Sequence, residues 1–211
     1  MHIVILFLSL IPVISHADGK PVYLTSEIPY VDIKHNNKIV RIKRNPDNGN
    51  IIDLDYGLTS RPCPPYCIQP IKLAEGIETI AELELIQYLQ AASKGSETIM
   101  LIDSREKKWL DKGMIPGAIN IPWQQLYNKT SSPEKIAELI TLHFNVARTG
   151  SIWNFQNAKT LIFYCNGPWC GQSATNIRAL LNLGYPASKL KWYRGGMQSW
   201  LSLGLTVVTP D

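Results

Sequence analysis

The spacing of apolar residues divides the chain into a β-rich beginning and a longer part in which helices and strands alternate. Residues 30–44, YVDIKHNNKIVRIKR, form two short runs of alternating apolar and polar positions. Such alternation is typical of strands that bury one face. Because His35-Asn36-Asn37 separates the two runs, the pattern predicts a hairpin with a three- to four-residue turn. The turn-forming residues NPDNGN (45–50) end the second run.

Beyond residue 75, the apolar residues follow helical and strand periods in turn. TIAELELIQYLQAA (79–92) places apolar residues at helical spacing and predicts an amphipathic helix. Further helices are predicted from SSPEKIAELITLHF (131–144), SATNIRALLNLGY (173–185) and GMQSWLSLG (196–204). The first of these has Ser131 and Glu134 at capping-box spacing, with Pro133 in the first turn. Short apolar runs predict strands at 98–103, 118–121, 160–164 and 189–193. Strands interleaved with helices indicate an α/β domain with a mostly parallel sheet.

The beginning of the chain has the pattern of a secretory signal peptide. MHIVILFLSLIPVISHA (1–17) contains an apolar run from Ile3 to Ile14 that is too short to span a bilayer. Ser15 and Ala17 provide small residues at the −3 and −1 positions of a cleavage site. We therefore expect cleavage after Ala17 and export to the periplasm or the medium. We expect no membrane insertion of the mature chain.

Composition and charge add little to this picture. The chain has 211 residues, of which 45% are hydrophobic and 18% charged, with a formal net charge of +4. The basic run KIVRIKR (38–44) alternates charged and apolar residues, which indicates the solvated face of a strand rather than a nucleic-acid site. The length suits a signal peptide (1–17), a β-rich extension with a Pro- and Cys-rich connector (18–75), and one α/β domain (76–211).

The mature chain has four cysteines in two closely spaced pairs, Cys63 with Cys67 and Cys165 with Cys170. In an exported protein they can form two disulfides, with three possible connectivities. Neither spacing matches the C-x2-C typical of structural zinc, so no metal is expected. The prolines of RPCPPYC favour an extended segment that would hold Cys63 and Cys67 about 12 Å apart. We favour their pairing through a sharp bend, for instance at a cis proline; otherwise each thiol pairs with Cys165 or Cys170, or stays free. Such a pair would be a staple or a second redox pair.

The stretch LIFYCNGPWCGQS (161–173) carries the candidate chemistry. Strand-forming residues run into Cys165, and a helix is predicted to begin near Ser173. A cysteine between a strand and a helix lies near backbone N–H groups and the positive end of the helix dipole, and both favour a thiolate. We expect the amides of residues 166–171 to form this cradle, although Pro168 has no N–H. The candidate substrate-binding residues share this turn: Asn166, Gly167, Trp169, Gly171, Gln172 and Ser173.

Three segments of the α/β part carry distinctive motifs in a fixed order. They are LIDSREKKWLDKGMIPGAINIPW (101–123), LIFYCNGPWCGQSATNIRALLNLGY (161–185) and KLKWYRGGMQSWLSLGL (189–205). Together they resemble a rhodanese-like (sulfurtransferase) domain over about residues 76–207. The resemblance implies a rhodanese-like α/β fold, with a mostly parallel five-stranded sheet flanked by helices, here preceded by a small β-rich extension. It also implies that Cys165 accepts a sulfane sulfur and passes it to a thiophilic acceptor. Asp103 and Arg105 are then structural and tie a strand end to neighbouring loops.

The loop after Cys165 departs from the family's pattern. The common loop has five residues between the cysteine and a Ser or Thr that opens the helix, whereas Ser173 lies eight positions after Cys165. The cation usual near the end of the loop is absent, and Cys170 and Gln172 occupy that stretch. Related phosphatases grip phosphate with an Arg where this chain has Gly171, so phosphatase activity is not expected. A loop with few cations also offers no obvious grip on thiosulfate.

Cys170 leaves three functions open. It can be a resolving thiol that attacks a persulfide or mixed disulfide on Cys165. The two cysteines can instead be a thiol–disulfide redox pair, or an inert bridge in a non-catalytic binding module. We expect an exported sulfurtransferase of the thiosulfate or polysulfide type, with Cys165 as its persulfide carrier. Its expected partners are a small sulfur-containing donor and a thiol acceptor, on a small molecule or on a partner protein; no cofactor, metal or nucleic acid is expected.

Overall fold

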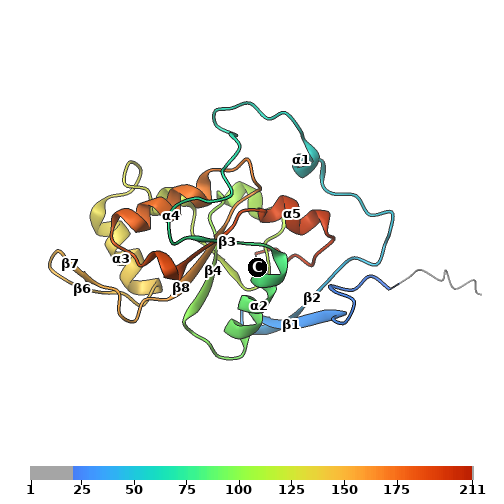
Figure 1. Cartoon of the computed structure of the whole chain (residues 1–211), viewed down its shortest axis with the longest axis horizontal. Coiled ribbons are helices and arrows are strands. Elements are labelled where there is room, and N and C mark those ends of the chain that lie inside the picture. Colours follow the sequence, from blue (N-terminus) through green and yellow to red (C-terminus); the bar gives the residue numbers. More distant parts are fainter. Residues whose placement is uncertain (1–20, 211) are drawn as a thin grey trace, which may run out of the picture.

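The centre of the molecule is a parallel sheet (Figure 1). The computed structural model describes residues 21–210, so the predicted signal peptide lies outside the described residues. The sheet has the order β3-β9-β8-β4-β5, and every neighbouring pair is parallel. Its strands are β3 (Glu78–Ile80), β4 (Ile99–Asp103), β5 (Ala118–Asn120), β8 (Thr160–Tyr164) and β9 (Leu190–Tyr193). The predicted α/β fold with a mostly parallel five-stranded sheet is confirmed.

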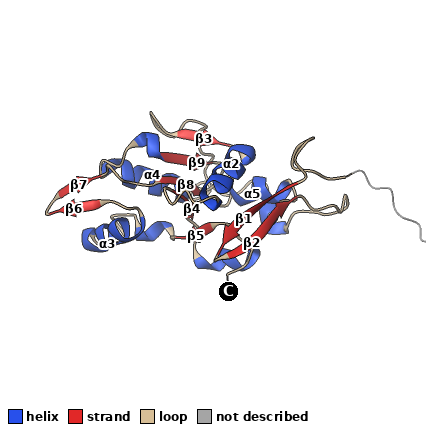
Figure 2. Cartoon of the chain, turned by 90° about the horizontal axis from the view of Figure 1, so that it is seen from below, coloured by secondary structure: helices blue, strands red, loops and turns tan. Residues whose placement is uncertain are grey.

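Helices cover both faces of the sheet (Figure 2). They are α2 (Glu82–Ser93) and α5 (Gly196–Ser202) on one face, and α3 (Pro133–His143) and α4 (Gln172–Asn182) on the other. Successive strand residues alternate between the two cores: Leu101 and Ile162 pack with α2 and α5, whereas Ile102 and Phe163 pack with α3 and α4. Buried apolar residues on both faces of β4 and β8 therefore explain their uninterrupted apolar runs. Shorter helices are α1 (Leu54–Gly57), η1 (Lys107–Lys112), η2 (Trp123–Gln125) and η3 (Ala187–Lys189).

The N-terminal hairpin packs against the domain. It consists of β1 (Tyr30–His35) and β2 (Lys38–Lys43), and Val31, Ile33 and Ile42 belong to the same core as α2 and α5. The predicted turn length is wrong: His35 pairs with Lys38, which leaves a two-residue turn. Asn36 and Asn37 have φ values of 47° and 61°, as the tight turn with two left-handed residues requires.

Two helices begin later than predicted. Residues 79 and 80 belong to strand β3, and α2 starts at Glu82, where the Ala81 N–H donates to the Glu84 carboxylate at 3.1 Å. The N-cap of α3 is Ser132 instead of Ser131, and its hydroxyl accepts from the Lys135 N–H at 3.4 Å. The hairpin of β6 (Ala147–Thr149) and β7 (Ile152–Asn154) was not predicted, because its short strands are mostly exposed and carry no clear alternation.

The carboxyl ends of three adjacent strands converge where the candidate chemistry lies. Cys165 follows β8, Ser104 follows β4 and Arg194 follows β9, and β8 lies between the other two strands. In open parallel sheets this edge is the usual place for a ligand site. Across residues 21–210, no helix combines the length and apolar character that a membrane span would need.

Candidate active site

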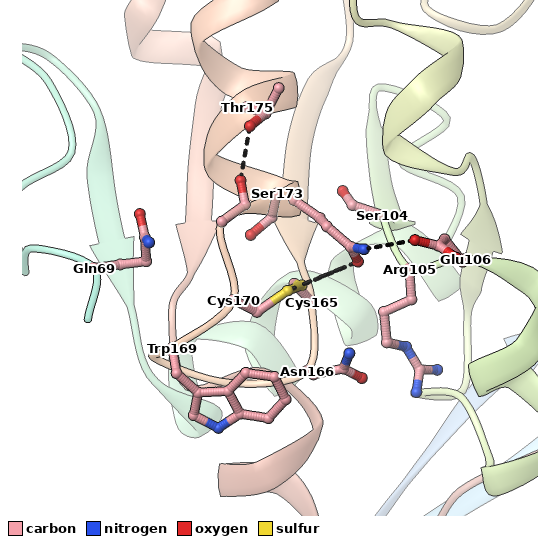
Figure 3. Close-up of a disulfide and its surroundings, with 12 residues drawn as sticks. Gln69, Ser104, Arg105, Glu106, Cys165, Asn166, Trp169, Cys170, Ser173 and Thr175 are labelled. Carbon is pink, nitrogen blue, oxygen red and sulfur yellow. Dashed lines mark hydrogen bonds between the residues drawn. A yellow bond between two sulfur atoms is a disulfide. The ribbon is translucent and has the colours of Figure 1, made fainter. Parts of the chain in front are cut away.

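The loop between β8 and α4 is closed by a disulfide. Cys165 directly follows β8 and bonds to Cys170, two residues before α4 begins at Gln172, and their Cα atoms lie 6.2 Å apart (Figure 3). Both residues are buried, with 2% and 5% of their surfaces exposed. The position predicted for the nucleophile is therefore at a strand end and at a helix start, and its sulfur is held in a bond to the second cysteine of the loop.

The disulfide loop rests on the beginning of α5. The Met197 N–H donates to the Cys165 carbonyl at 3.0 Å, and the Gln198 N–H donates to the Asn166 carbonyl at 2.9 Å. A Cβ atom on Gly196, whose φ is +57°, would lie 2.4 Å from the Cys165 carbonyl oxygen. This close approach gives a physical reason for a glycine at position 196.

One of the backbone donors predicted for the anion cradle is used within the loop itself. Pro168 has none, and the Cys170 N–H donates to the Gly167 carbonyl at 2.9 Å. The carbonyls of Cys165 and Asn166 face α5, and a trans peptide points its N–H opposite to its carbonyl. The N–H groups of Asn166 and Gly167 therefore point away from α5.

The side-chain amide of Gln172 lies close to both sulfurs of the disulfide. Its Oε1 lies 3.5 Å from the Cys165 Sγ and 3.7 Å from the Cys170 Sγ, while its Nε2 donates to Glu106 Oε1 at 3.4 Å. In the disulfide neither sulfur carries a proton. In the dithiol, either thiol can donate to this oxygen. The contact with Glu106 thus orients the amide so that its oxygen faces both sulfurs.

The remaining predicted turn residues have different surroundings. Asn166 Oδ1 accepts from the Tyr56 hydroxyl at 3.5 Å, and Ser173 is buried, its hydroxyl accepting from the Trp192 indole N–H at 3.0 Å. The Trp169 indole N–H donates to Gln198 Oε1 at 2.9 Å. Of the six residues proposed for substrate binding, four line the cleft described below: Asn166, Trp169, Gly171 and Gln172. Gly167 and Ser173 lie behind it.

Asp103 and Arg105 form a fully buried ion pair beneath the site. Arg105 Nη2 donates to Asp103 Oδ2 at 2.6 Å and to the Gly113 carbonyl at 2.7 Å. Its Nη1 donates to the Tyr56 hydroxyl at 2.8 Å, and the Tyr164 hydroxyl donates to Asp103 Oδ2 at 2.8 Å. Burial raises the pKa of Tyr164 well above its ordinary value, which keeps its hydroxyl a donor. The pair therefore ties the end of β4 to neighbouring loops.

The Pro- and Cys-rich connector packs over the active loop. Cys63 and Cys67 form a disulfide with Cα atoms 4.6 Å apart, across cis peptide bonds at Cys63-Pro64 and Pro64-Pro65. The ring of Tyr66 meets Trp169 edge-on, with centroids 5.5 Å apart. The Gln69 N–H donates to the Pro168 carbonyl at 2.8 Å. The two disulfides thus pair neighbours in sequence, and their loops touch.

A cleft of about 310 Å³ opens above the disulfide between these two loops. Four aromatic side chains contribute to its lining, and Cys170 lies in it. The lining residues are Pro65, Tyr66, Glu106, Lys108, Trp109, Trp123, Asn166, Trp169, Cys170, Gly171, Gln172 and Thr175. Trp169, a candidate binding residue from the sequence, is one of these walls. Glu106 could have been found from its place one residue after the Asp103-Ser-Arg105 motif, whereas nothing in the periodicity of the connector indicates Tyr66.

The cleft has little net charge. Its two charged side chains neutralise each other, because Lys108 Nζ lies 2.9 Å from Glu106 Oε2. The arginines nearby are engaged elsewhere: Arg61 stacks over the Trp169 ring at 3.8 Å, and Arg194 donates to the Gln69 carbonyl at 2.7 Å. Within residues 21–210, no group of three or more His, Cys, Asp or Glu side chains is placed to hold a metal ion.

Comparison with known proteins identifies one domain family. The family model described as the rhodanese-like domain matches residues 85–203. Solved structures with a similar arrangement include a human single-domain sulfurtransferase, TSTD1, at 23% identity, covering 59% of this chain and 95% of that one with a TM-score of 0.40. A rhodanese-related protein from Thermoplasma volcanium matches at 23% identity, over 63% of this chain and 99% of that one, with a TM-score of 0.40. BH2092 from Bacillus halodurans matches at 25% identity, over 59% and 72%, with a TM-score of 0.39. No curated protein sequence matches significantly.

Proposed function

The chain belongs to the rhodanese-like domain family, and from this premise we propose that it is a sulfurtransferase with Cys165 as its sulfur carrier. One observation supports this role above the others: Cys165 directly follows β8 and starts the loop into α4, at the edge where three strand ends converge. A helix start favours negative charge on a thiolate and equally on a persulfide.

The transfer follows two displacements on the reduced loop. The Cys165 thiolate attacks the sulfane sulfur of a donor, and the bond between that sulfur and the donor breaks with its electron pair going to the leaving group. An acceptor thiolate or cyanide then attacks the outer sulfur of the persulfide, and the Cys165 thiolate is regenerated. The cycle needs no net oxidant, but it begins only after a thiol has opened the disulfide with Cys170.

The proposal includes export and a thiol acceptor. The predicted signal peptide (1–17) supports an oxidising compartment, and four cysteines in two disulfides fit that setting. The small donor is of the thiosulfate or polysulfide type, and the acceptor carries a thiol.

Mass spectrometry of the fully reduced protein tests the carrier. After incubation with thiosulfate or polysulfide, the peptide containing Cys165 should gain about 32 Da, one sulfur atom. Cys165→Ser should lose the adduct and Cys170→Ser should retain it. Absence of any adduct in folded, fully reduced protein would refute the proposal.

A second candidate is a thiol–disulfide oxidoreductase that uses Cys165 and Cys170 together. The disulfide between them favours it directly. The two serine variants separate the candidates, because a dithiol redox site fails in both, whereas a carrier fails only without Cys165. A non-catalytic binding module would show no turnover in either assay.

A further inference from the structure

The disulfide at the floor of the cleft is itself an electrophile, and its surroundings favour a small sulfur nucleophile. We propose that the oxidised loop takes up sulfur as hydrosulfide, HS⁻, and converts it into protein-bound sulfane sulfur. This activity lies beyond the proposed function, which starts from a reduced loop and a donor already at the sulfane level. It rests on that function only for the last step, in which the sulfur is passed to an acceptor.

Access to the disulfide is one-sided. Cys170 lies in the lining of the cleft, whereas Cys165 lies behind it, next to the end of β8. Both are nearly fully buried, so a bulky thiol meets steric resistance at either sulfur. A nucleophile that enters the cleft meets the Cys170 Sγ first. Attack there expels Cys165, the cysteine proposed as the carrier.

Size and charge of the cleft discriminate between sulfur compounds. A cavity of about 310 Å³ with four aromatic walls, whose one cation is paired with Glu106, offers few groups to replace the hydration of a dianion such as thiosulfate. Hydrogen sulfide is neutral or singly charged near neutral pH and contains a single heavy atom. Desolvating it in this cleft therefore costs far less than desolvating thiosulfate.

The chemical step balances without a further reagent. HS⁻ attacks the Cys170 Sγ and forms a new S–S bond, while the Cys165–Cys170 bond breaks and its electron pair leaves with Cys165. The products are a Cys170 hydropersulfide and a Cys165 thiolate, so the incoming sulfur is oxidised and Cys165 is reduced. The Cys165 thiolate can then attack the terminal sulfur of that persulfide, which moves the sulfane sulfur to Cys165 and leaves a Cys170 thiolate.

Gln172 is positioned to serve both sulfurs during this exchange. Its Oε1 lies within 3.7 Å of each, so it can accept a hydrogen bond from whichever cysteine is left as a protonated thiol. After the acceptor removes the sulfane sulfur, the loop is a dithiol. Two electrons and two protons must then pass to an external disulfide-bearing oxidant before the next hydrosulfide can react.

Charging with sodium sulfide alone tests the proposal. Oxidised protein is incubated with sulfide without any sulfane donor, desalted, alkylated and mapped by mass spectrometry, with released sulfane sulfur measured by cyanolysis. We expect about one sulfane sulfur per chain, as a gain of about 32 Da on the peptide that contains Cys165 and Cys170. Protein reduced beforehand should gain none from sulfide, because it holds no oxidising equivalent at this loop.

Two further arms keep the outcome decisive. Cys170→Ser cannot form the loop disulfide, so it should gain no sulfur from sulfide. The inference is overturned if the oxidised loop stays closed, if it opens to a dithiol without sulfane sulfur, or if the sulfur appears only on the peptide with Cys63 and Cys67. Failure of reduced wild-type protein to accept sulfur from polysulfide would instead count against the proposed function. The sulfur gained by oxidised protein from sulfide does not depend on that result.

Discussion

Two disulfide loops of nearly equal size lie against each other in this molecule, and only one of them is in a setting for catalysis. Cys63 and Cys67 are four residues apart in CPPYC, and Cys165 and Cys170 are five apart in CNGPWC. In each, a proline and then an aromatic residue precede the second cysteine. The first loop belongs to no helix or strand and is largely exposed, whereas the second joins a buried strand to a helix.

The comparison shows that the surroundings, and not the cysteine spacing, distinguish a structural staple from a reactive pair. The buried loop has a helix start, the Gln172 amide and a cleft at its second cysteine. The exposed loop contributes Pro65 and Tyr66 to the wall of that cleft. The two aromatic residues that precede the second cysteines, Tyr66 and Trp169, meet edge-on. The first loop thus shapes the access to the second.

The largest expected effect concerns the packing beneath the buried loop. In Gly196→Ala, the new Cβ would lie 2.4 Å from the Cys165 carbonyl oxygen and 2.8 Å from the Gly167 nitrogen, in a left-handed conformation. These are backbone atoms, so the loop must shift. We expect the free energy of unfolding to fall by about 3 kcal/mol, with a loss of sulfur charging at Cys165. Urea denaturation and the mass assay measure the two effects.

Gly150→Ala is the matched control for this change. Gly150 has a φ of +60°, and no neighbouring heavy atom lies within 4 Å of a Cβ built there. Only the conformational penalty remains, so we expect a loss of about 1 kcal/mol and unchanged charging. Equal losses of unfolding free energy in the two variants would show that close packing under the active loop contributes nothing to stability.

The next effect separates stability from chemistry in the two loops. Replacing either cysteine pair by serines opens a ring of similar size, and chain entropy predicts a loss of about 2 kcal/mol in unfolding free energy for each. We expect Cys165→Ser/Cys170→Ser to abolish sulfur charging. Cys63→Ser/Cys67→Ser should still charge at Cys165 in folded protein, as measured by thermal unfolding and mass spectrometry. If the second variant is folded but no longer charges, the exposed pair takes part in the chemistry and the contrast between the loops fails.

The parts of this architecture that follow local periodicity could be predicted from the sequence. Strands β4 and β8 are buried on both faces, so their apolar runs are unmistakable, and the strand-end position of Cys165 follows directly. Strand β3 has three residues at the edge of the sheet, and the strong helical pattern that follows it concealed its start. The turn of the first hairpin was predicted too long, because the sequence alone does not reveal that Asn36 and Asn37 both take left-handed conformations.

The sequence allowed prediction of only those parts of the site that lie within a single motif or loop. Asp103, Arg105 and Cys165 were recognised from motifs, and the buried ion pair accounts for the first two. The cleft, in contrast, depends on where the connector runs. Contacts such as that of Gln69 with Pro168 join residues far apart in the sequence, and no hydrophobic pattern indicates them. Gln172 was named as a binding residue, but its contact with both sulfurs depends on Glu106 from another strand end.

The smallest expected effect concerns one of the contacts between the connector and the buried loop. The Arg61 guanidinium lies 3.8 Å from the centre of the Trp169 ring, and its Nη2 donates to the Asp55 carbonyl. Stacking of this kind contributes about 1 kcal/mol, so Arg61→Ala should lower the unfolding free energy by that amount. Because the wall of the cleft loosens while Cys165 is untouched, the KM for the acceptor should rise more than kcat falls.

Arg148→Ala is the control for Arg61→Ala, because it removes an arginine that stacks on a tryptophan away from the cleft. Arg148 lies over Trp153 at 4.9 Å on the β6–β7 hairpin, which takes no part in lining the cleft. The variant should leave both KM and kcat unchanged. An equal rise of KM in both variants would show that the effect of Arg61 is not local. An Arg61→Ala variant with lower kcat and unaltered KM would mean that the exposed loop acts on the sulfur chemistry itself rather than on access to it.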